Sequence, residues 1–229
     1  MYAQLKQEVF TANLLLVKHN LVVMTWGNAS GVDRSHGIVA IKPSGVDYST
    51  LTPDDIVLVD LEGRVVEGNL KPSSDLPTHL ELYRAWPSVG GIVHTHSAFA
   101  TSFAQALSPI PCFGTTHADH FHGEVPCTRT LAGGEVEKDY ERNTGKVILE
   151  RFAGLDSAAV PGVLVAGHAP FTWGPTPLKA VENSVALEQI AQMAILTREI
   201  SPNAGVIPAY VLEKHYSRKH GDHAYYGQK

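Results

Sequence analysis

The feature that most limits the folds open to this chain is its alternation of strand-like and helix-like segments. Short runs rich in β-branched residues, typical of buried strands, occur at GIVAI (37–41), IVLVD (56–60) and GGIVH (90–94). The run at 56–60 is followed, across a Glu62-Gly63 turn, by a second short run, which predicts a hairpin. Alternating strands and helices with a hairpin included indicate an α/β fold, in which helices cover the faces of a mixed sheet.

Helices are predicted where apolar residues recur at spacings of three and four. These segments are, in chain order, 5–19, 75–86, 97–107, parts of 133–154, 178–200 and 208–221. Residues 21–30 are predicted as a strand that runs into a turn at Gly27 and Asn28, and 160–168 as a strand that ends at Gly167 and His168. No linker, repeat or low-complexity block divides the series, so we expect a single domain, 1–229.

Charge and hydropathy narrow the function classes. A net charge of −5 and a pI near 6.2, with Lys and Arg scattered along the chain, argue against a nucleic-acid partner. The first residues, MYAQLKQEVF, are interrupted by polar side chains and do not resemble a secretory signal, and no stretch of about 18 apolar residues occurs elsewhere. We therefore expect a cytoplasmic protein with no membrane partner.

Two histidines in one strand-like run indicate a metal site. In GGIVHTHS, His94 and His96 lie two positions apart, so their side chains point to the same side of a strand and two imidazoles can reach one ion. His168, at the end of another apolar run, is the preferred third ligand, with His79 and His117 as competitors. Asp75, at a predicted helix start, is a fourth candidate, although capping is the ordinary role of such a residue. Imidazoles with a carboxylate suit Zn²⁺ first and Mn²⁺ or Co²⁺ next, with a coordination position left for substrate.

Three turns of small residues have the components of a phosphate site. Backbone N–H groups at such turns and at a helix N-terminus, with hydroxyl groups and a lysine nearby, bind anions. Each turn alone is weak evidence, because such turns usually only reverse the chain, and only their joint occurrence beside a metal motif favours a phosphate site. The residues concerned are Gly27 and Asn28 in WGNAS, Lys42, Ser44 and Gly45 in KPSG, and Ser73 and Ser74 in KPSSD.

Taken together, these motifs resemble a known family. WGNAS, IKPSG, KPSSDLPTH, GGIVHTHS, GTTHAD, the strand-ending GH and HYSRKHG followed by AYYGQ, in this order over essentially the whole chain, resemble the L-ribulose-5-phosphate 4-epimerases of the class II aldolase superfamily. The resemblance implies a three-layer α/β/α fold around a mixed, largely antiparallel sheet. It also implies a homotetramer with fourfold cyclic symmetry and one zinc ion per subunit, in an active site at the subunit boundary.

The resemblance assigns a role to each matching residue. The metal ligands would be His94, His96 and His168, with Asp75 as the acidic member. The substrate, chiefly its phosphate, would be bound by Gly27, Asn28, Ser44, Gly45, Ser73 and Ser74. Asp119 and Tyr226 would be the two proton carriers, Tyr226 reaching in from a neighbouring subunit, and His215 is a further candidate to cross the interface.

The reaction implied is the interconversion of L-ribulose 5-phosphate and D-xylulose 5-phosphate. The carbon to be inverted has no neighbouring carbonyl to acidify it, so the family cleaves the adjacent carbon–carbon bond, rotates the aldehyde and re-forms the bond. The metal ion stabilises the negative charge that develops on cleavage. Epimerases of arabinose catabolism and of ascorbate use share these motifs, so the pathway stays open.

Three alternatives remain. An aldolase of the L-fuculose-1-phosphate type would cleave the sugar phosphate and release the fragments. Those enzymes carry glutamate as general base where this chain has Asp75, whose side chain is shorter by one methylene, which favours the epimerase. A dehydratase of the same fold is disfavoured by the THAD and AYYGQ segments. A non-catalytic scaffold, as in adducin, is disfavoured by the presence of three histidines together with Asp75 and Asp119.

Overall fold

The protein is built on one seven-stranded sheet with the strand order β4-β3-β2-β1-β5-β7-β6. The computed structural model describes residues 2–221 and 224–226. The strands are β1 (Gly27–Asp33), β2 (Ile38–Ile41), β3 (Val57–Asp60), β4 (Val65–Glu67), β5 (Gly91–Thr95), β6 (Gly162–Leu164) and β7 (Pro170–Gly174). The α/β prediction is confirmed, and all six pairings between these strands are antiparallel. The seven described strands have no parallel pairing among them, because the helices connect β4 to β5 and β5 to β6, and neither of these pairs is adjacent in the sheet.

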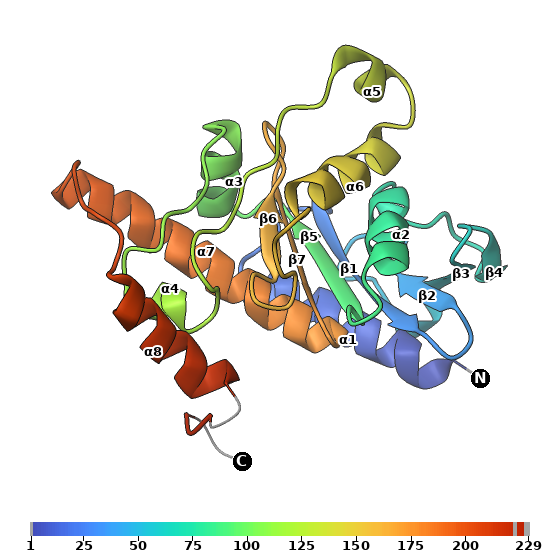
Figure 1. Cartoon of the computed structure of the whole chain (residues 1–229). Helices are drawn as coiled ribbons and strands as arrows, with labels where there is room; N and C mark the ends of the chain where they lie inside the picture. The colour runs from blue at the N-terminus through green and yellow to red at the C-terminus, as the bar shows by residue number, and fades with distance from the viewer. Residues whose placement is uncertain (1, 222–223, 227–229) are drawn as a thin grey trace.

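Helices cover both faces of the sheet and give three layers (Figure 1). The α-helices are α1 (Ala3–Lys18), α2 (Leu76–Ala85), α3 (Ala98–Gln105), α4 (Thr115–Ala118), α5 (Gly133–Glu137), α6 (Tyr140–Arg151), α7 (Pro177–Ile200) and α8 (Ala209–His220), and Pro53–Asp55 forms a short 3₁₀ turn. Helices α1 and α7 lie on one face, while α2 and α6 pack together on the other. The six predicted helical segments are confirmed, with 133–154 divided into α5 and α6.

The alternation of side chains along the strands explains the layers. Ala29 and Val93 pack in one cluster with residues of α1 and α7. Ile92 and Phe171 belong to the larger cluster, which includes residues of α2 and α6. Because neighbouring strand residues point to opposite faces, a strand buried on both sides is apolar throughout, as the sequence of β5 is up to His94.

The predicted strand over residues 21–26 is wrong. This apolar segment has no strand structure, and β1 begins at Gly27, where a turn was expected. Gly27 has a φ of +134°, and a Cβ at that position would meet the carbonyl oxygen of His94 at 2.8 Å. Glycine therefore lets β1 approach β5 closely, and the strand carries small polar residues because its first part lines a cavity rather than the core.

The predicted strand that ends at His168 is shorter than expected. It consists of β6, which stops at Leu164, and a tight turn that leads into β7. The backbone N–H of Val165 donates to the carbonyl of Ala169, and the N–H of His168 donates to the carbonyl of Val165. His168 therefore lies on a hydrogen-bonded turn beside β5.

Helix α8 lies apart from the sheet and packs on the short helix α4 (Figure 1). It follows α7 after a connection of eight residues, 201–208. Among the residues that the structure describes, no helix is long and apolar enough to span a membrane.

Candidate active site

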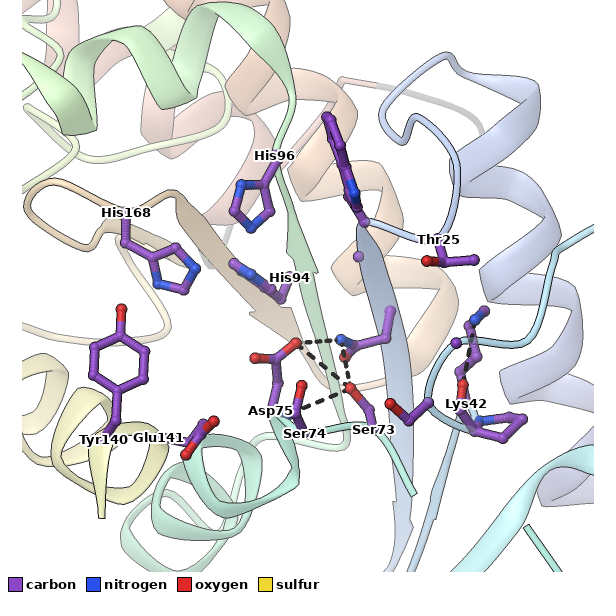
Figure 2. A pocket seen from close by; sticks show the side chains of 16 residues that line it. Thr25, Lys42, Ser73, Ser74, Asp75, His94, His96, Tyr140, Glu141 and His168 are labelled. Carbon is purple, nitrogen blue, oxygen red and sulfur yellow. Dashed lines mark hydrogen bonds between the residues drawn. The ribbon is translucent and has the colours of Figure 1, made fainter. Parts of the chain in front are cut away.

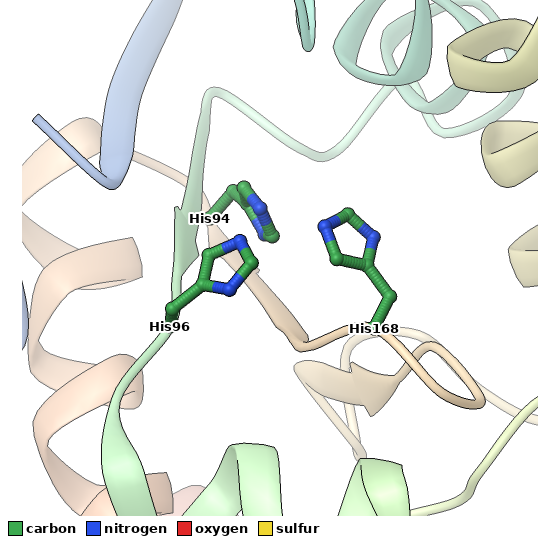
Figure 3. Close-up of side chains that lie close together, drawn as sticks. All are labelled: His94, His96 and His168. Carbon is green, nitrogen blue, oxygen red and sulfur yellow. The ribbon is translucent and has the colours of Figure 1, made fainter.

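Three imidazoles converge at one end of the central strands (Figure 3). His94 lies on β5, His96 directly after it, and His168 on the β6–β7 turn, with ring centroids 4.9 to 5.0 Å apart. One nitrogen of each ring lies within 4.8 Å of the others. Nitrogens that share a tetrahedral zinc ion lie about 3.4 Å apart, so small side-chain rotations bring this set to metal-binding distance. The structure thus brings together the three histidines that the sequence singled out.

The ring of His94 is oriented by its surroundings. Its Nδ1 lies 2.9 Å from the carbonyl oxygen of Pro170, and the ring stacks on Phe171 at a centroid distance of 4.2 Å. Because a carbonyl only accepts hydrogen bonds, Nδ1 carries the hydrogen and Nε2 keeps a free lone pair. This is the tautomer that a metal ligand requires.

The electrostatic environment keeps the other two rings neutral. Burial lowers the pKa of His168 to about 4, with further contributions from His94 and His96. Burial also lowers the pKa of His96, and His94 adds to the effect. Neutral imidazoles bind transition metals and protonated ones do not.

A buried nitrogen of His168 further supports a ligand from outside the chain. Its Nδ1 is buried and has no hydrogen-bond partner among the described residues. An unsatisfied buried nitrogen is costly unless a bound group completes its environment. The donor set, the tautomer of His94 and this nitrogen together fit a divalent metal ion.

Asp75 lies beside the imidazoles and is held by the neighbouring strand. Nδ2 of Asn28 donates to Oδ2 of Asp75 at 2.7 Å and to Oγ of Ser73 at 3.0 Å. Burial works to raise the pKa of Asp75, but the nearby imidazoles, His94 foremost, and the amide of Asn28 outweigh it and lower the pKa. Asp75 therefore stays a carboxylate in the same cavity as the histidines, although it is not among the three converging ligands.

The predicted anion-binding residues line that same cavity (Figure 2), which has a volume of about 570 Å³. Gly45, at a φ of +67°, forms the exposed turn after β2. Lys42 donates to the carbonyls of Val46 at 2.6 Å and Pro43 at 3.3 Å, and its ammonium lies 4.6 Å from the ring centroid of Tyr48. The cavity-lining residues named from sequence are Gly27, Asn28, Lys42, Ser44, Gly45, Ser73, Ser74, Asp75, His94, His96 and His168.

Sequence reasoning gave no role to five residues of the cavity wall. Thr25 precedes the WGNAS motif, Trp26 and Pro43 lie within the WGNAS and KPSG motifs, and Tyr140 and Glu141 begin α6. Tyr140 lies 6.1 Å from His168, measured between ring centroids. No motif surrounds Tyr140 and Glu141, and only the packing of α6 against α2 places them at the site.

The two competing histidines lie elsewhere. Nδ1 of His79 lies 2.7 Å from Oγ of Ser30 in the fully buried core, where burial lowers the pKa of His79 to about 3. His117 lies on α4 and lines a second cavity of about 290 Å³ with residues of α7. Both are core residues that the sequence pattern alone does not separate from ligands.

The two residues predicted as proton carriers form a separate cluster, with Asp119 directly after α4 and Tyr226 beyond the end of α8. Asp119 accepts hydrogen bonds from Arg218 at 2.6 and 3.0 Å and lies 3.1 Å from Nδ1 of His215. The guanidinium of Arg218 lies over the ring of Tyr226, with the Cζ atom of Arg218 4.7 Å from the ring centroid. Neither Asp119 nor Tyr226 lines the histidine cavity of its own chain.

Comparisons with known proteins agree with this arrangement. Residues 7–195 match the family described as the class II aldolase and adducin N-terminal domain. An L-fuculose 1-phosphate aldolase structure is similar over 94% of this chain and 95% of its own, with 28% identity and a TM-score of 0.80. The L-fuculose-1-phosphate aldolase of Thermus thermophilus is 26% identical over 90% of this chain and all of its own, with a TM-score of 0.69. The sugar-phosphate aldolase of Thermotoga maritima, 19% identical over 87% of this chain and 97% of its own with a TM-score of 0.64, shares the fold. Because the match spans most of its length, the chain, which brings three imidazoles together on that fold, belongs to the class II aldolase and adducin family.

Proposed function

We propose that the protein is a divalent-metal-dependent sugar-phosphate enzyme, and specifically an L-ribulose-5-phosphate 4-epimerase. The observation that carries the proposal is that the imidazole triad and the residues of all three small-residue motifs, WGNAS, KPSG and KPSSD, line one cavity. A volume of about 570 Å³ accommodates a pentulose phosphate. Family membership supports the chemistry, and the resemblance of the THAD and AYYGQ segments supports the epimerase.

Each group of the cavity has a task in this reaction. A divalent ion held by His94, His96 and His168 would supply Lewis-acid stabilisation of the negative charge that develops on the ketose oxygens. The ammonium of Lys42, with the turn residues 44–45 and 73–74, would hold the phosphate, so that the aldehyde fragment rotates without leaving. Oδ1 of Asn28 is buried and has no hydrogen-bond partner among the residues that the structure describes, and it would accept a substrate hydroxyl group.

The proton carriers would come from a second copy of the chain. Asp119 and Tyr226 form a cluster away from the cavity of their own chain, so a homotetramer with the site at the subunit boundary would supply them. Two carriers are required because the hydroxyl proton is exchanged on opposite faces of the aldehyde in the two epimers.

The second candidate is an L-fuculose-1-phosphate aldolase, which the similar structures favour. The argument for the epimerase rests on Asp75, whose carboxylate is held against Asn28 at 2.7 Å. A side chain shorter than glutamate and tied to β1 is less able to reach the substrate as a general base.

The test is incubation of the zinc-loaded protein with L-ribulose 5-phosphate, followed by carbon NMR. Growth of D-xylulose 5-phosphate signals, abolished by a chelator and restored by zinc, is the expected result. Parallel incubation with L-fuculose 1-phosphate provides the comparison. Rapid release of free aldehyde from that sugar, with no epimer formed from ribulose phosphate, would replace the epimerase by the aldolase.

A further inference from the structure

Arg218 of α8 contacts both proposed proton carriers. Its Nε donates to Oδ1 of Asp119 at 3.0 Å, and its Nη2 donates to Oδ2 at 2.6 Å. The same guanidinium lies 4.7 Å from the ring centroid of Tyr226. The backbone carbonyl of Arg218 also accepts the N–H groups of Tyr225 and Tyr226, at 3.0 and 3.1 Å. One residue therefore sets the place of Asp119 relative to Tyr226.

The geometry of these contacts is more restrictive than an ordinary surface ion pair. A planar guanidinium that bonds both carboxylate oxygens fixes the rotation of the carboxylate, which a point charge such as lysine does not. The side chains of Arg218 and Asp119 are only 24% and 14% exposed, so solvent and salt screen them incompletely. The N–H bonds to the carboxylate lie in the guanidinium plane, so a face of that plane is free to stack on the tyrosine ring.

We propose that Arg218 is a positioning residue for the proton-transfer steps and that it holds Asp119 and Tyr226 in a fixed mutual orientation. The inference rests on the proposed function, because it assumes that these two residues carry the protons. Arg218 itself touches no reacting atom in this arrangement. It acts through the carboxylate and the phenol.

Arg218 also controls the charge of Asp119. Burial works to raise the pKa of Asp119, and the hydrogen bonds from Arg218 and then His215 outweigh it and lower the pKa. The other titratable groups nearby are Lys219 and His220 on α8 and His120 beside Asp119. Loss of the guanidinium raises the pKa of Asp119, so a higher pH than in the wild type is needed to form the proton-accepting carboxylate.

The experiment compares Arg218→Gln and Arg218→Lys with Arg129→Gln. Arg129 is a matched control, because its guanidinium pairs with Glu135 and Glu150 but contacts neither carrier. In Arg218→Gln we expect kcat to fall about 100-fold, as for a displaced catalytic group, while KM and the amount of bound zinc stay unchanged. The acid limb of the pH profile of kcat should move to higher pH. Arg218→Lys keeps the positive charge but loses the planar guanidinium, so its kcat should lie between those of the wild type and Arg218→Gln. Arg129→Gln should retain the wild-type kcat, KM and pH profile.

The inference would be overturned if a folded Arg218→Gln protein had the kcat of the wild type and the same acid limb in its pH profile. An equal loss of kcat in Arg129→Gln would also overturn it. If Arg218→Gln does not fold, Arg218→Lys carries the same comparison. Carbon NMR of aspartate-labelled protein measures the pKa of Asp119 without substrate, and an unchanged pKa in the Arg218 variant also refutes the proposal. Absence of any sugar-phosphate turnover in the wild type would defeat the proposed function instead and leave the NMR measurement to decide on Arg218.

Discussion

The side-chain amide of Asn28, at the start of β1, donates a hydrogen bond of 2.7 Å to Oδ2 of Asp75, at the start of α2. This bond connects two parts of the cavity wall, because Asn28 belongs to β1 and Asp75 lies beside the imidazoles. The amide also bonds Ser73, so a single side chain orders the whole turn before α2. The metal end and the phosphate end of the proposed site are thus joined through one side chain.

Replacing a triad histidine should remove the metal. In His96→Asn one neutral imidazole is lost, and the remaining pair binds zinc much more weakly, so both zinc content and activity should fall to background. Metal analysis after dialysis, beside an activity assay, measures the effect. The matched control is His36→Asn, an exposed histidine in the β1–β2 turn. A zinc-loaded, fully active His96→Asn protein would refute the ligand assignment.

Mixed subunits should test whether the proton carriers come from a second chain. His96→Asn and Tyr226→Phe proteins are each expected to be inactive, one through its metal site and the other through its proton transfer. If they are dissociated and reassembled together, some interfaces combine an intact triad with an intact Tyr226, and activity should return. Reassembly of each variant alone is the control. No recovery in verified mixed oligomers would place both functions in one subunit.

Lys42 should contribute to substrate binding rather than to turnover. Lys42→Gln removes a charge-assisted hydrogen bond to phosphate worth about 2 kcal/mol, so KM for a sugar phosphate should rise about 30-fold with little change in kcat. Steady-state kinetics measures both. Lys18→Gln, at an exposed position at the end of α1, makes the same charge change away from the cavity and should leave KM unchanged. An unaltered KM in Lys42→Gln would show that the phosphate binds elsewhere.

Acid should destabilise the protein through buried histidines. Burial lowers the pKa of His117 to about 4, from the 6.5 of an ordinary histidine. Between these values the unfolded state binds a proton that the folded state does not, so stability is fully present above pH 6.5 and is lost as pH falls toward 4, by up to about 3 kcal/mol.

Urea unfolding at several pH values, with excess chelator and fixed protein concentration, measures this slope. In His117→Gln the dependence of the unfolding free energy on pH should weaken by up to one proton. Thr116→Ser, a change in the same cavity without a titrating group, should retain the wild-type slope. An identical slope in His117→Gln would mean that the pKa of His117 is the same in the folded and unfolded states.

The helices were predictable because their periodicity is a local property. The apolar residues of α2 recur at spacings of three and four, and Pro87 follows shortly after its end. The first strand was not predictable, because LVVMTW has strand-like composition whereas GNASGVD does not. Tertiary contacts decided that case, since Gly27 and Asn28 pair with β5 and face the cavity.

The identity of the ligand candidates was therefore encoded locally, in residue types and spacing: two histidines on one face of an apolar strand, a third after another apolar run, and small-residue turns rich in hydroxyl groups. Which histidines converge, and which are core residues, was decided only by folding, since His94 and His168 are 74 positions apart and meet through the pairing of β5 with β7. The separation of Asp119 and Tyr226 from that cavity, and their attachment to Arg218, likewise follow from the packing of α8 on α4. Contacts between residues distant in sequence depend on the burial and pairing of whole elements, which no single segment specifies.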